Sequence, residues 1–104
     1  MDRRVVWTEA AWSDLGAAAD YIARDSPRYA AAFVREVRDA ARTLRHFSER
    51  GRTVPEFGQP EFRELLVRSY RLVYTVKADT VYILGFIHGS RDLANWRPGK
   101  EVAR

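Results

Sequence analysis

The first third of the chain alternates between apolar stretches and short polar breaks, and these predict a strand followed by a helix. Residues 3–7 (RRVVW) are rich in β-branched and aromatic side chains, which is typical of a strand. Apolar residues then recur at spacings of four, three and four, the period of one helix face, at Ala11, Leu15, Ala18 and Ile22. Thr8 stands just before this pattern and can cap the helix N-terminus.

A second helix is predicted after the break Asp25-Ser26-Pro27. Pro27 cannot continue the first helix, but its fixed φ suits the first turn of a new helix with Ser26 as N-cap. The second helix carries an apolar stripe about 20 residues long, formed by Ala30, Phe33, Val34, Val37, Ala40, Ala41, Leu44 and Phe47. Because the connection is so short, we expect the two helices to lie antiparallel as a hairpin.

The second half of the chain predicts a loop and then three strands. Glycine and proline residues mark residues 48–60 as a loop. Strand-like segments follow at residues 61–67, 70–77 and 80–88, separated by Arg68-Ser69 and Ala78-Asp79, which leave room only for tight turns. The three strands should therefore form an antiparallel meander.

The last predicted strand is apolar on both alternating sets of positions. Val81, Ile83 and Ile87 form one set, and Tyr82, Leu84 and Phe86 form the other. Burial on both faces predicts a central strand, and Gly85 would allow another group to approach closely.

The predicted element order is β-α-α-β-β-β, an α+β fold with the helical hairpin packed on one face of a small, mainly antiparallel sheet. A chain of 104 residues fits one domain, which we place at residues 1–93. Residues 94–104 form a C-terminal tail, which either docks through Trp96 or is loose.

Charge and composition narrow the protein class without choosing a function. The net charge is +4, and 16 of the 18 basic residues are arginine, whose planar guanidinium suits carboxylates and phosphates. This surface is either simply solvated or attracts nucleic acid or an acidic protein. With no signal-peptide pattern and a longest apolar run of only seven residues, we expect a cytoplasmic protein that makes no use of a membrane.

No strong enzyme or metal motif is present in the sequence. The chain has no cysteine, and its two histidines lie 42 residues apart, so we expect neither a metal site nor a cofactor. The residues that could carry chemistry are Arg52, Glu56, Arg63, Arg71, His88 and Arg91.

Each candidate also has a structural interpretation. Arg63 and Arg71 lie on adjacent strands and could share a face as a phosphate- or carboxylate-binding pair, or each could bind a local carboxylate and brace the sheet. His88 ends a buried strand, where a hydrogen-bonded structural role competes with a role as general acid or base. Arg91 could pair with Asp92 or face a target. Glu56 is either a surface residue of the loop or a general base.

The resemblance to a known family rests on six segments: VVWTEAAWSDL, DSPRYAAAFV, GRTVPEF, FRELLV, YRLVYTV and VYILGFIHGSRD. In this order they resemble the RelE/ParE toxins of bacterial type II toxin–antitoxin systems, over roughly residues 5–92. The resemblance implies a small α+β domain and a partner antitoxin that wraps around the toxin in a hetero-oligomer. RelE-like members cleave mRNA on the ribosome, whereas ParE-like members poison DNA gyrase.

The departures from the nuclease pattern favour the ParE-like branch. RelE-like enzymes use lysines and arginines with a C-terminal tyrosine, or glutamate, arginine and a histidine–tyrosine end. Residues 51–61 contain no lysine, and the HGSRD ending has neither a tyrosine nor a second histidine. We therefore expect a non-enzymatic gyrase inhibitor to which we assign no catalytic residue, with Arg52, Arg63, Arg71 and Arg91 as partner-binding candidates.

Two alternatives stay open. The first is a metal-independent, ribosome-dependent mRNA endonuclease that would use His88, Arg63, Arg71 and Arg52. The second is an inactive module that retains only antitoxin binding or a regulatory role.

Overall fold

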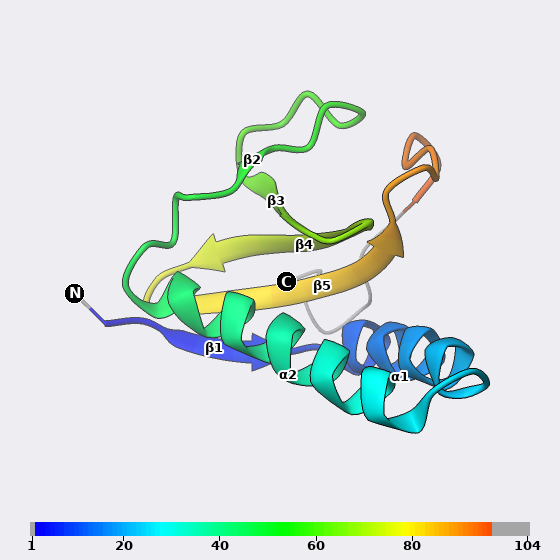
Figure 1. Cartoon of the computed structure of the whole chain (residues 1–104). Coiled ribbons are helices and arrows are strands. Elements are labelled where there is room, and N and C mark those ends of the chain that lie inside the picture. Colours follow the sequence, from blue (N-terminus) through cyan, green and yellow to red (C-terminus); the bar gives the residue numbers. More distant parts are fainter. Residues whose placement is uncertain (1, 97–104) are drawn as a thin grey trace.

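The computed structural model describes residues 2–96 and shows a helical hairpin on one face of a five-stranded sheet (Figure 1). The elements, in chain order, are β1 (Arg4–Trp7), α1 (Glu9–Ala23), α2 (Pro27–Arg42), the short 3₁₀ helix η1 (Thr43–Arg45), β2 (Arg52–Thr53), β3 (Phe62–Val67), β4 (Tyr70–Lys77) and β5 (Thr80–His88). The predicted α+β class and element order are therefore confirmed, with one strand added. No helix within residues 2–96 is long and apolar enough to cross a membrane.

The strand order is β1-β5-β4-β3-β2, and only the β1–β5 pair is parallel. The meander β3-β4-β5 follows from two tight turns, in which Arg68 and Ala78 adopt positive φ values of 53° and 55°. The predicted loop at residues 48–60 was wrong in one respect, because Arg52 and Thr53 pair with β3 as an edge strand. A two-residue strand leaves no periodic pattern in the sequence.

The helix boundaries follow their caps. Thr8 and Ser26 cap the two helices as predicted, accepting backbone hydrogen bonds from Ala11 and Tyr29. Thr8 also donates its hydroxyl to the carbonyl of Ile83 (2.8 Å), which ties the start of α1 to β5. The apolar stripe of α2 was predicted to include Phe47, but that side chain is exposed, because α2 ends at Arg42 and the chain has turned by residue 47.

A β-bulge in β5 changes which side chains share a face. Val73 pairs with Gly85 and Tyr74 with Ile83, so Leu84 has no partner on β4. The extra residue shifts the alternation by one position. Phe86 therefore joins Val81 and Ile83 in the core beneath the helices, while Ile87 joins Leu84 on the other face. The prediction was therefore wrong for the two residues after the bulge, because it placed Ile87 with Val81 and Ile83, and Phe86 with Leu84.

The outer face of the sheet, away from the helices, has a smaller core of its own. Val54 and Phe57 of the loop after β2, together with Leu93 and Trp96, cover Val73, Leu84 and Ile87. Trp96 stacks on Phe57 (centroids 5.9 Å apart), and its indole lies 2.6 Å from where a Cβ on Gly85 would stand. Trp96 thus docks on the sheet, and Gly85 admits it as predicted. Residues 97–104 of the predicted tail lie outside the described residues.

Candidate functional site

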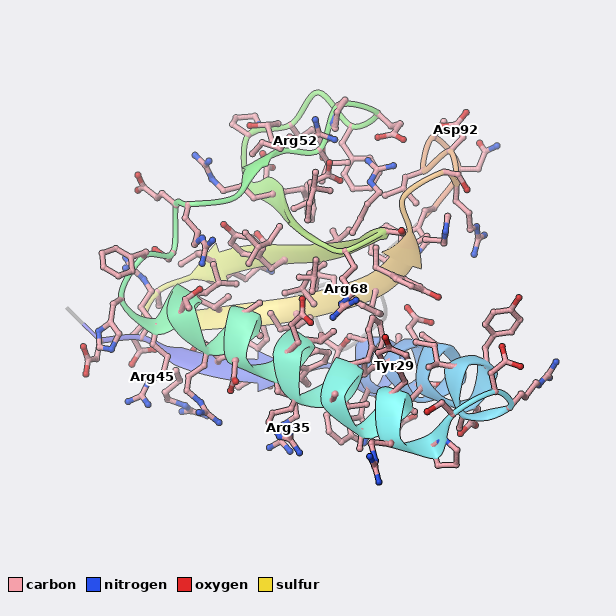
Figure 2. All side chains as sticks on the ribbon, viewed as in Figure 1. Tyr29, Arg35, Arg45, Arg52, Arg68 and Asp92 are labelled. Atoms are coloured by element: carbon pink, nitrogen blue, oxygen red, sulfur yellow. The ribbon has the colours of Figure 1, made fainter. Side chains whose placement is uncertain are left out.

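Two arginines and two glutamates form a chain of ion pairs on the outer face of the sheet. Glu64 of β3 is fully buried and accepts hydrogen bonds from Arg52 Nε and Arg71 Nε, each at 2.7 Å. Arg52 Nη2 also lies 2.7 Å from Glu64 Oε2 as part of the same ion pair. Arg71 of β4, also buried, makes a bidentate pair with Glu56 through Nη1 (2.8 Å) and Nη2 (2.5 Å). The network joins β2, β3, β4 and the loop of Glu56. Figure 2 shows Arg52 on that loop side of the sheet.

The network also holds the segment that follows β5. Glu56 Oε2 accepts the backbone N–H of Leu93 (3.2 Å), and Arg71 Nη1 donates to the carbonyl of Arg91 (3.1 Å). Residues 91–93 are therefore fastened to the sheet through the Arg71–Glu56 pair. The partner candidate Arg91 is therefore exposed at the surface, and its backbone carbonyl is held by Arg71.

Arg71 and Glu56 each stabilise the charged form of the other. The hydrogen bonds from Arg71 are the main reason that the pKa of Glu56 is lowered from 4.5 to about 2. The same pairing raises the pKa of Arg71 further above its ordinary value. A carboxylate with so low a pKa binds a proton weakly, which makes Glu56 a poor general base near neutral pH.

Arg63 and Arg71 do not form the pair that the sequence suggested. In the β3–β4 register, Arg63 lies opposite Tyr74 and Arg71 lies opposite Leu66. Side chains opposite each other share a face, so Arg63 points to the helix side and Arg71 to the outer side. Arg63 donates to the carbonyls of Gly51 (2.7 Å) and Glu49 (3.4 Å) and so braces the loop before β2.

His88 lies apart from the arginine network. It stands opposite Tyr70 in the β4–β5 register, and the two rings meet at 5.3 Å, on the face opposite to Arg71. The imidazole is exposed, and its Nδ1 accepts the backbone N–H of Ser90 (3.2 Å) while lying 2.8 Å from the Ser90 hydroxyl. Of the two interpretations, the local hydrogen bonds match the structural one, and β5 is buried or half-buried as predicted except at His88, its last residue.

The candidate residues therefore do not converge on one point. Arg52, Arg71 and Glu56 lie together on the outer face and are paired within the network through Glu64. Arg63 faces the helices, and His88 lies at the C-terminal end of β5. Within residues 2–96, no group of three or more His, Cys, Asp or Glu residues is arranged to hold a metal ion.

The sequence candidates did not include Glu64, the buried centre of the network, or Asp14, a polar residue that joins a helix to the sheet. Asp14 of α1 accepts the backbone N–H of Phe86 (3.1 Å), at the edge of β5 beyond the end of β1. Burial raises the pKa of Asp14, and this hydrogen bond opposes the rise. The sequence position of Asp14 could have indicated this role. It lies three residues after Ala11 and next to Leu15, which places its side chain at the border of the predicted apolar stripe.

Comparison with known proteins agrees with this architecture. Residues 5–93 match the family described as the ParE toxin of the type II toxin–antitoxin system, parDE. Toxin RelE2 of Caulobacter vibrioides is 36% identical over 89 residues, which cover 85% of this chain and 97% of that protein. In fold, the chain is similar to a structure of the chromosomal ParDE system from P. aeruginosa. The TM-score is 0.70 at 24% identity, covering 83% of this chain and 95% of that one. The chain therefore belongs to the ParE toxin family of type II toxin–antitoxin systems, within the RelE/ParE superfamily.

Proposed function

We propose that this toxin acts on DNA gyrase as a binding inhibitor that traps the enzyme on cleaved DNA, and that it is not a nuclease. The observation that carries the proposal is the separation of His88 from the Arg52–Arg71 network by the sheet itself. Metal-free RNA cleavage needs a base, an acid and cationic phosphate clamps within hydrogen-bond reach of one phosphate.

The state of each candidate supports the same proposal. Arg71 is buried and already bonded to both Glu64 and Glu56, so a phosphate would have to displace a carboxylate from a buried pair to reach it. Arg52 is exposed, and its Nε and Nη2 already contact Glu64. The pKa of Glu56, at about 2, disfavours proton abstraction. Arginine itself is a poor proton shuttle because its pKa is very high.

The proposed activity is tested by adding purified, antitoxin-free toxin to gyrase and relaxed plasmid DNA. We expect loss of supercoiling and accumulation of cleaved DNA. The control is His88→Ala, which should inhibit gyrase as well as the wild type does. Supercoiling that is unchanged at high toxin excess, with protein that is folded and toxic in cells, would contradict the proposal.

A ribosome-dependent mRNA endonuclease is the second candidate, favoured by the 36% identity to a protein named RelE2. In that case His88 would have to carry proton transfer, since the other candidates are arginines, which are poor proton shuttles, and Glu56, which Arg71 holds in its ionised form. Primer extension on ribosome-bound message distinguishes the two activities. Cuts within codons that disappear in His88→Ala would favour the nuclease, and an uncut message would favour gyrase.

We also propose a cognate antitoxin as the physiological partner of the chain. Large apolar side chains are left exposed on several elements, namely Trp12, Tyr21, Tyr29, Phe47 and Leu66. A partner chain that covers such residues would bury apolar area beyond what this small domain can bury alone. Co-purification as a salt-resistant complex is the expected result, and separation of the two proteins in moderate salt would contradict it.

A further inference from the structure

A groove lined by arginines lies between β1 and α2, on the opposite side of the molecule from the ion-pair network. Its volume is about 460 Å³, and it is lined by the strand β1 and by Arg3, Arg4, Arg38, Arg42 and Arg45. A neighbouring hollow shares Arg38 and Arg42 with it and adds Arg35. Figure 2 shows Arg35 and Arg45 on the same side of α2, with Arg68 on the other.

These arginines differ from Arg52 and Arg71 because their charges are largely unmatched. Within residues 2–96, their carboxylate contacts are long and exposed: Arg42 to Asp39 at 3.6 Å and Arg45 to Asp2 at 4.0 Å. Arg3 has a buried Nε with no hydrogen-bond acceptor in the described part of the chain. From Arg35 to Arg45 the row runs about 15 Å along the helix axis. The groove is therefore a strip of positive charge open to an anionic chain.

An exposed indole lies beside the strip, next to Arg38. Trp12 of α1 is 52% exposed, with the Arg38 guanidinium over its ring at 5.9 Å. Its edge contacts Trp7 of β1, with the centroids 5.6 Å apart. Trp7 itself lines the groove. Proteins that bind single-stranded nucleic acid combine these two features, a basic groove for the backbone and an aromatic ring on which a base can stack.

We propose that this groove binds single-stranded nucleic acid, with the arginine row on the phosphates and Trp12 stacked on a base. Neither the arginine–phosphate contacts nor the stacking on Trp12 involves the 2′-hydroxyl, so DNA and RNA of the same length should bind with similar affinity. The inference is independent of whether gyrase or the ribosome is the target.

An acidic peptide added as a strand to β1 suits the groove less well. The free edge of β1 is short, because the strand covers only Arg4–Trp7 before α1 begins. At its start, the N–H of Arg3 is already taken by the carbonyl of Arg45 (2.9 Å). A peptide strand would find few free backbone groups there, whereas the positive charges continue along α2 past the end of the edge.

The test is fluorescence anisotropy of the purified chain with labelled 15-mers of deoxythymidine and of uridine across a salt series. We expect similar affinities for the two, and a log–log salt slope of about −3 for roughly four phosphate contacts. Arg38→Gln/Arg42→Gln should lower the affinity roughly tenfold or more and make the slope shallower by about 1.4. Trp12→Ala should weaken binding by roughly fivefold to a hundredfold.

The matched control is Arg24→Gln/Arg68→Gln, which removes the same charge away from the groove. Equal weakening by both double variants would overturn the proposal in favour of general charge attraction. Absence of binding at low salt would also overturn it. Binding of a polyglutamate peptide instead of the 15-mers, lost in Arg38→Gln/Arg42→Gln, would assign the groove to an acidic protein segment.

Discussion

Arg71 is a guanidinium buried in the sheet, and its removal leaves Glu64 with half of its compensating charge. Truncating one partner of a buried ion pair costs about 3–5 kcal/mol, since the remaining charge stays in a poorly solvating environment. We therefore expect Arg71→Met to lower the free energy of unfolding by about that amount in urea titrations. Arg68→Gln, which breaks the exposed pair with Glu36, is the control and should cost about 1 kcal/mol or less. Equal effects of the two would mean that the buried network adds no stability.

Glu56 gives the network a dependence on pH. Its pKa in the folded protein, about 2, lies below the ordinary value of 4.5, so the folded state favours the ionised form. The resulting stabilisation is complete above about pH 5 and is lost as the pH falls toward 2. We expect the urea midpoint of the wild type to decline more steeply over this window than that of Glu56→Gln. Parallel declines in the two proteins would contradict the assigned role of Glu56.

At the scale of elements, replacing two glycines by alanine should change stability in opposite directions, because the space for a Cβ is occupied at Gly85 and open at Gly16. A Cβ at Gly85 would stand 2.6 Å from the Trp96 ring, so Gly85→Ala should displace the indole and cost about 1–3 kcal/mol. Nothing lies within 4 Å of a Cβ at Gly16 in α1, so Gly16→Ala should stabilise the helix by about 0.5–1 kcal/mol. Thermal unfolding and near-ultraviolet circular dichroism measure both. An unchanged aromatic spectrum in Gly85→Ala would refute the docking of Trp96.

The elements also show what the sequence could and could not predict. Caps, helix periodicity and tight turns were local signals, so the hairpin and the three meander strands were predictable. The turn at Arg68-Ser69 even fixes Val67 opposite Tyr70, from which it follows that Arg63 and Arg71 lie on opposite faces. The bulge at Leu84 and the edge strand β2 depend instead on pairing between distant segments. The Arg71–Glu56 pair could not be predicted either. Glu56 lies in a loop 15 residues before Arg71, and packing of the outer core sets the position of that loop.

At the scale of the whole molecule, the fold separates two kinds of arginine. On the outer face Arg52 and Arg71 are neutralised and hold strands and loops together, whereas the row along α2 faces solvent. The arginines available to a partner are therefore those along α2, and not Arg52 and Arg71, which the sequence had suggested. This division agrees with a toxin that works by docking on its target.

The most direct test of this account is the gyrase cleavage reaction, with wild-type toxin and His88→Ala compared side by side on supercoiled plasmid. We expect both proteins to accumulate linear DNA to the same extent, because the proposed activity needs no proton transfer at His88. Intact plasmid in both reactions, combined with cleavage of ribosome-bound mRNA by the wild type alone, would contradict the account and make His88 a catalytic residue.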